Sequence, residues 1–144
     1  SILQAPAIAV PKLAMLNLHS GLLPAYQGVM STFRALYHQE ETIGTTLHYI
    51  ENGEIDRGPV IARSQTAARF DRSYLWNVLN LYRDGGENVI EAIAQLSAGV
   101  SLSATPQTGR GQYYTFPTAQ EVDAASMPLF VNGDADNLDQ LLTD

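Results

Sequence analysis

The chain has 144 residues, 45% of them hydrophobic and 16% charged, which is enough apolar material to bury the core of one domain. The absence of cysteine excludes a disulfide scaffold, a thiolate zinc site and a cysteine nucleophile. The net charge of −7 argues against nucleic acid as a direct partner, because phosphate backbones are held mainly by Lys and Arg.

The first elements follow from proline positions and apolar runs. A short helix or turn is expected between Pro6 and Pro11. The next run, LAMLNLH at residues 13–19, is apolar until it ends in polar residues, which is typical of a buried parallel strand. The segment SGLLPAYQG at 20–28 has the Gly and Pro content of a loop. Residues 29–39 show helical spacing of apolar side chains.

The second half of the pattern is a hairpin followed by a long helix. Residues 43–50 and 60–66 are expected to be strands, and the turn residues of ENGEIDRGP join them. A helix is expected over 70–96, with Asp71 as its N-cap and a break or kink at Gly85-Gly86. Its expected buried stripe comprises Leu75, Val78, Leu79, Tyr82, Val89, Ile90, Ile93 and Leu96.

This order of strands and helices indicates an α/β fold with a mixed sheet and flanking helices. It supplies about three strands, whereas a doubly wound sheet usually has about five or six. We therefore expect residues 1–100 to form half of an α/β domain. Residues 101–144 are expected to be an extended acidic tail, since six acidic residues and no basic one follow Arg110. No run approaches the roughly 18 apolar residues of a membrane span, and no secretory signal pattern is present, so we expect a cytoplasmic protein.

Asn17 and His19 are the first candidates for chemistry. They are two positions apart in a strand, so their side chains point to the same face. An amide can donate a hydrogen bond to a developing oxyanion, and an imidazole can move protons near neutral pH. Spacing alone leaves open the alternative that both residues simply close the strand and bond to loop backbone.

Two further residues can join this site. Asp56 lies in the turn ENGEIDRGP, where it is either an exposed turn aspartate or a carboxylate that reaches His19 and raises its affinity for a proton. His48 lies in the expected strand at 43–50. His19, His48 and Asp56 together could surround a metal ion, but no close ligand spacing supports this. We expect no metal site, and a structural or supporting role for His48.

Three segments together resemble the formyltransferase family that uses 10-formyltetrahydrofolate. NLHSGLLPAYQG resembles the family's Asn-x-His segment with its Leu-Leu-Pro loop, IGTTLHYI resembles the following strand, and EIDRGPVIARSQ resembles the segment that carries the family's Asp. Each piece alone is weakly specific, but the ordered set is highly specific. The resemblance runs from about residue 13 to 66 and implies a partial Rossmann-like fold.

The resemblance implies roles for the residues that match. Asn17 would hold the formyl oxygen as the tetrahedral intermediate forms, His19 would assist proton transfer, and Asp56 would position His19 or a relaying water. Glu54, Ile55 and Asp56 would line the folate site. The formyl donor would be 10-formyltetrahydrofolate and the acceptor a primary amine. Gln27 stands where many relatives have Arg or Lys, which bears on the acceptor.

Two alternatives stay open beside formyl transfer. One is a formyltetrahydrofolate hydrolase of the same family, which uses water instead of an amine. The other is a noncatalytic binding or assembly module that keeps the motif. The family's preceding strands are not in this sequence, so we expect a catalytic half that self-associates or pairs with a chain supplying the missing N-terminal half.

Overall fold

The computed structural model describes residues 8, 11–51 and 53–134. Within them lie strands β1 (Leu16–His19), β2 (Tyr26–Gly28), β3 (Thr42–Tyr49), β4 (Val60–Ala67) and β5 (Gln112–Tyr114), and helices α2 (Ser31–Tyr37), α3 (Tyr74–Ser97) and α4 (Ala119–Asp123). The turn expected between residues 6 and 11 lies almost entirely outside the described residues. No helix in the described ranges is long and apolar enough to cross a membrane.

The central sheet has the order β1-β3-β4, and both of its pairings are antiparallel. The expected hairpin of residues 43–50 and 60–66 is confirmed as β3 and β4. The expectation of a parallel strand at 13–19 is wrong for the pairing that the structure describes, because β1 runs antiparallel to β3. An apolar run indicates burial on both faces, but it carries no information on the direction of the neighbouring strand.

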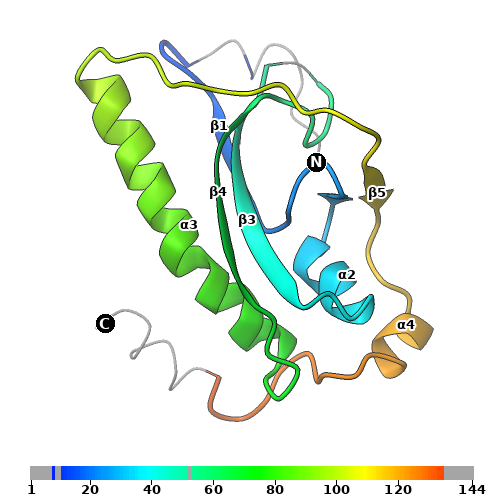
Figure 1. Ribbon diagram of the computed structural model, residues 1–144. Helices are drawn as coiled ribbons and strands as arrows, with labels where there is room; N and C mark the ends of the chain where they lie inside the picture. Colours follow the sequence, from blue (N-terminus) through cyan, green and yellow to red (C-terminus); the bar gives the residue numbers. More distant parts are fainter. Residues whose placement is uncertain (1–7, 9–10, 52, 135–144) are drawn as a thin grey trace.

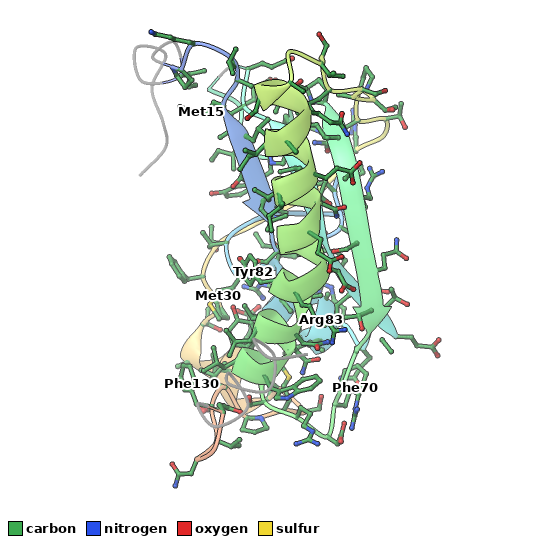
Figure 2. All side chains as sticks on the ribbon, turned by 90° about the vertical axis from the view of Figure 1, so that its left-hand side faces the viewer. Met15, Met30, Phe70, Tyr82, Arg83 and Phe130 are labelled. Carbon is green, nitrogen blue, oxygen red and sulfur yellow. The ribbon has the colours of Figure 1, made fainter. Side chains whose placement is uncertain are left out.

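Helices cover both faces of this sheet, which confirms the α/β class (Figure 1). Helix α3 lies along one face, where Leu47 of β3 packs with Ala92 and Leu102. Helix α2 lies on the other side, where Phe33 and Leu36 are fully buried in a second cluster. Seen from the α3 side, the helix lies in front of the sheet, between β1 and β4 (Figure 2).

Helix α3 differs from its expected form in its cap, its continuity and its buried face. Its N-cap is Ser73, whose hydroxyl accepts a hydrogen bond from Trp76 N, while Asp71 pairs with Arg69 instead. The helix is continuous through Gly85 and Gly86. Gly85 faces the sheet, where a Cβ would lie only 2.7 Å from Thr45 Oγ1. The face turned to the sheet therefore carries Asn77, Leu81, Gly85 and Ala92, while Tyr82, Ile90 and Ile93 of the expected stripe are exposed.

The segment after α3 is more ordered than an extended tail. Strand β5 pairs with β2 in a separate parallel two-stranded sheet, so part of the expected loop at 20–28 is a strand. Helix α4 begins with a capping box formed by Thr118 and Glu121. Met127 is 4% exposed and belongs to the same cluster as Phe33. The division of the chain at residue 100 stays a prediction, and the acidic end at 135–144 lies outside the described residues.

Candidate active site

Four polar side chains meet at the end of β1. Asn17 and His19 project from one face of β1, and Asn17 is the cross-strand partner of His48 on β3. Asp56 comes from the turn between β3 and β4. Its Oδ2 lies 3.6 Å from His19 Nδ1, and its Oδ1 lies 3.3 Å from Asn17 Nδ2. The expected proximity of these three residues is therefore confirmed, while their catalytic roles stay predictions.

The amide of Asn17 is held by two acceptors. His48 Nδ1 lies 2.8 Å from the Tyr49 carbonyl oxygen, which can only accept, so this nitrogen carries the ring hydrogen. His48 Nε2 is then the acceptor for Asn17 Nδ2 at 3.1 Å. The second amide hydrogen of Asn17 points to Asp56 Oδ1 at the longer distance of 3.3 Å. His48 thus orients the amide, in agreement with the supporting role expected for it.

The His19 ring has one nitrogen tied to the scaffold and one facing Asp56. Nε2 lies 2.6 Å from the Tyr26 carbonyl oxygen and 3.0 Å from Ser31 Oγ. The Tyr26 carbonyl requires the hydrogen on Nε2, which leaves the lone pair of neutral His19 on Nδ1. Burial lowers the pKa of His19 below its ordinary value, although the Asp56 carboxylate and the bond to Tyr26 oppose this. His19 is therefore a neutral base at pH 7.

The backbone conformation of Asp56 directs its side chain into the site. It has a φ of 53°, the left-handed region that Asp tolerates better than most residues. Its side chain is only 9% exposed, which decides against the exposed turn aspartate. Oδ2 accepts a hydrogen bond from Gly28 N at 2.8 Å. Burial alone would raise the pKa of Asp56, but the neighbouring His48 and His19 rings and the Gly28 N–H hold that pKa below its usual value, so the group is a carboxylate.

The loop between β1 and α2 is fixed to the sheet behind it. Thr46 Oγ1 donates to the Gly21 carbonyl at 2.7 Å and accepts from Leu23 N at 3.1 Å. Thr32 Oγ1 donates to the Ser20 carbonyl at 2.7 Å. Beside the loop lies a cavity of about 180 Å³. Its lining includes Gly21, Leu22, Tyr26, Ser31, Ala35 and Ile43.

The other residues expected at the site concern the folate and a metal ion. Glu54 is exposed, Ile55 is half-buried and Asp56 is buried, and the role expected for these three residues at a folate site stays a prediction. Within the described part of the chain, no group of three or more His, Cys, Asp or Glu residues could hold a metal ion. The three-residue metal arrangement considered from the sequence thus finds no support in this geometry.

Several contacts were not visible in the sequence. Tyr26 supplies a carbonyl oxygen, Gly28 a backbone N–H and Ser31 a hydroxyl, and the first two are backbone groups that carry no residue-type signal. Gln107 binds the carbonyl oxygens of Asp56 and Gly58 from a segment expected to be a tail. Only the tertiary arrangement brings these groups together.

The chain is similar in sequence to known formyl transferases. Residues 1–74 match the family model described as Formyl transferase. The methionyl-tRNA formyltransferase of Herminiimonas arsenicoxydans is 33% identical over 120 residues, which are 83% of this chain and 37% of that protein. The enzyme of the same name from Parvibaculum lavamentivorans is 30% identical over 138 residues, 96% of this chain and 43% of that protein.

Solved structures show the same fold. An N-formyltransferase from Helicobacter canadensis, in complex with folinic acid and dTDP-3-aminofucose, superimposes with a TM-score of 0.69 at 21% identity, covering 85% of this chain and 43% of that one. Glycinamide ribonucleotide transformylase 1 from Symbiobacterium toebii gives a TM-score of 0.64 at 22% identity, covering 74% of this chain and 51% of that one. The family model covers more than half of the sequence, so the chain belongs to the formyl transferase family. It spans 37% to 43% of the length of the two relatives above.

Proposed function

We propose that this chain carries the catalytic residues for transfer of a formyl group from 10-formyltetrahydrofolate to a primary amine. The observation that carries the proposal is the meeting of Asn17, His19 and Asp56 in one site of a formyl transferase family chain. The Helicobacter canadensis structure holds folinic acid together with an amino sugar nucleotide, which supports a folate donor and an amine acceptor.

The geometry suits direct attack, with no covalent bond to the protein. As the amine nitrogen bonds to the formyl carbon, the carbonyl π electrons move onto the oxygen, and the Asn17 amide donates to it. The formyl oxygen would replace Asp56 Oδ1, the longer of the two amide contacts. His19 Nδ1 takes a proton from the attacking nitrogen, and the resulting imidazolium is stabilised by Asp56. Collapse restores the carbonyl and breaks its bond to the folate nitrogen, which leaves with the proton that His19 returns.

The turn that carries Asp56 would form one wall of the folate site. Ile55 is half-buried beside Asp56, and Glu54 precedes it on the exposed side of the turn. An apolar residue and backbone groups in this position suit the flat, polar-edged ring of a pterin. Asp56 would then contact both the folate donor and His19.

The acceptor that fits this chain best is a small amine. The two relatives described above are named methionyl-tRNA formyltransferases, but this chain carries a net charge of −7 with eight basic residues. Direct contact with tRNA phosphates requires Lys and Arg clusters that its composition does not provide. Any contact with tRNA would have to come from other protein segments.

The edge of the sheet suggests how the site is completed. β1 is the edge strand of the three-stranded sheet in the described residues, and an uncovered edge offers unpaired backbone groups to another strand. We propose that this edge pairs with a second copy or with a chain that supplies further strands, and we call the result the assembled enzyme. Light scattering tests this: we expect a species larger than one chain, and a monodisperse monomer active in formyl transfer would contradict it.

The reaction itself is tested by following the labelled carbon. The assembled enzyme is mixed with 10-formyltetrahydrofolate carrying ¹³C in the formyl group and with candidate primary amines, and the products are identified by ¹³C NMR. Transfer yields a formamide of the amine. Formate alone would overturn the proposal in favour of a hydrolase, and failure to bind or consume the folate would favour a noncatalytic module.

A further inference from the structure

The segment of residues 101–115, which we call the strap, connects the turn that carries Asp56 with strand β2, which carries Gly28. It leaves the end of α3, runs past the turn between β3 and β4 and reaches β5 (Figure 1). Thr105 and Val60 exchange two backbone hydrogen bonds, each 2.8 Å long, which anchor the strap at the start of β4. Further on, β5 pairs with β2, and Val29 N donates to the Tyr114 carbonyl at 3.1 Å.

Between these two anchors, Gln107 fastens the strap to the Asp56 turn. Its Nε2 donates to the Asp56 carbonyl oxygen at 2.9 Å and to the Gly58 carbonyl oxygen at 2.8 Å. Both partners are carbonyl oxygens that can only accept, so the orientation of the Gln107 amide is fixed. Neither Glu, which has no donor when ionised, nor an apolar residue can replace these two bonds.

These bonds act on the residue whose conformation matters most for the site. Asp56 is in the left-handed region, and this places its carboxylate against Gly28 N and near His19 Nδ1. A non-glycine residue holds such a conformation only when its surroundings fix it. The bond from Gln107 to the Asp56 carbonyl therefore constrains the backbone from which the carboxylate projects.

The strap also fixes the other partner of the carboxylate. At Gly28 a Cβ would lie 2.1 Å from the Tyr114 carbonyl oxygen, so the strap passes directly over this residue. The strap thus holds Asp56 through Gln107 and Gly28 through β5, and its course sets the distance between them. We propose that Gln107 is a positioning residue that aligns the Asp56 carboxylate with His19 and Gly28. This inference rests on the proposed function of the same site.

The test reads the carboxylate position directly, without activity. NMR follows the pH titration of the His19 ring protons and the Gly28 amide proton in the 144-residue chain, for wild type, Gln107→Met and Asp56→Asn. Gln107→Met keeps the side-chain size but removes the donors. We expect it to move both signals toward those of Asp56→Asn, with a lower His19 titration midpoint and a Gly28 amide that no longer senses a carboxylate. Gln112→Met, on the same strap with an exposed side chain, is the matched control and should titrate as wild type.

Each outcome separates the two proposals. If Asp56→Asn shifts both signals and Gln107→Met leaves both at their wild-type values, the positioning role is wrong while the proposed function stands. If Asp56→Asn shifts neither signal, the pairing of His19 with Asp56 is wrong, and both proposals fail. Gln107→Leu, which has neither a donor nor a charge, should repeat the effect of Gln107→Met and keeps the test decisive if the Met variant does not fold. In the assembled enzyme, the misplaced carboxylate should lower kcat by about 10-fold to 100-fold.

Discussion

The two adjacent glycines of α3 should respond in opposite ways to the same substitution. Gly85 faces the sheet, and a Cβ there would lie 2.7 Å from Thr45 Oγ1 and 3.3 Å from Leu18 Cδ2. Thr45 is fully buried, and its hydroxyl is hydrogen-bonded to Ser64 Oγ at 2.6 Å, so it cannot move aside without losing that bond. At Gly86 a Cβ would meet nothing within 4 Å.

The expected magnitudes follow from helix propensity and overpacking. Alanine stabilises a helix interior by about 1 kcal/mol over glycine, and this gain applies to both positions. Overpacking typically costs about 1–3 kcal/mol, and this cost applies only to Gly85→Ala. Gly86→Ala should therefore raise the free energy of unfolding by up to about 1 kcal/mol. The free energy of unfolding of Gly85→Ala should be about 1–3 kcal/mol lower than that of Gly86→Ala.

Urea unfolding of the wild type and both variants, followed by circular dichroism, measures these differences. Equal stabilisation by the two substitutions would refute the close approach of α3 to β3. Equal destabilisation would show that the helix does not continue through the glycines. The three proteins are compared at equal slope m of the unfolding free energy against urea concentration. A different m would indicate a change in the compactness of the native or unfolded state.

Two further predictions concern pH and a buried amide. The pKa of Asp56 and that of His19 are both lowered in the folded state, so stability should fall on acidification, first as pH drops below the ordinary His pKa of about 6.5 and again below the ordinary Asp pKa of about 3.9. Thermal unfolding against pH should show a smaller second loss in Asp56→Asn than in wild type, since Asp71 and Glu121 also have lowered pKa values and keep part of it, and an equal loss in both proteins would contradict the assignment. Asn77 is 1% exposed and bonds the backbone of Arg69 and Ser73, so Asn77→Ala should cost about 1–3 kcal/mol in urea unfolding. Asn80→Ala on the same helix is the control, and an equal effect of the two would refute this role.

Local patterns in the sequence predicted the elements and the first two site residues. The hairpin, the long helix and the shared face of Asn17 and His19 follow from the period of side chains along strands and helices, which is a local property. The family resemblance supplied Asp56, whose approach to His19 across the sheet no spacing could reveal. Its proximity to His19 is confirmed by the 3.6 Å contact.

What the sequence could not predict depends on long-range contacts. Asp71 and Ser73 are both good N-cap residues, and it is Ser73 that also bonds a distant group, because its hydroxyl donates to the Asp134 carboxylate. The buried face of α3 was predicted only in part: Val89 and Leu96 pack against the core, but Tyr82, Ile90 and Ile93 are exposed, and Gly85, which carries no apolar side chain, faces the sheet. The strap had no recognisable pattern, since its short strand β5 is defined only by pairing with β2.

The assignment of Asn17, His19 and Asp56 as catalytic residues is tested most directly by the rate of formyl transfer in single variants of the assembled enzyme. Asn17→Ala, His19→Ala and Asp56→Ala should each reduce kcat strongly while the circular dichroism spectrum stays that of wild type. For Asn17, the loss of an oxyanion donor should reduce kcat by about 10²–10³-fold. Near-normal turnover by His19→Ala would contradict the account, because the proposed mechanism assigns the proton transfer from the attacking amine to His19 Nδ1.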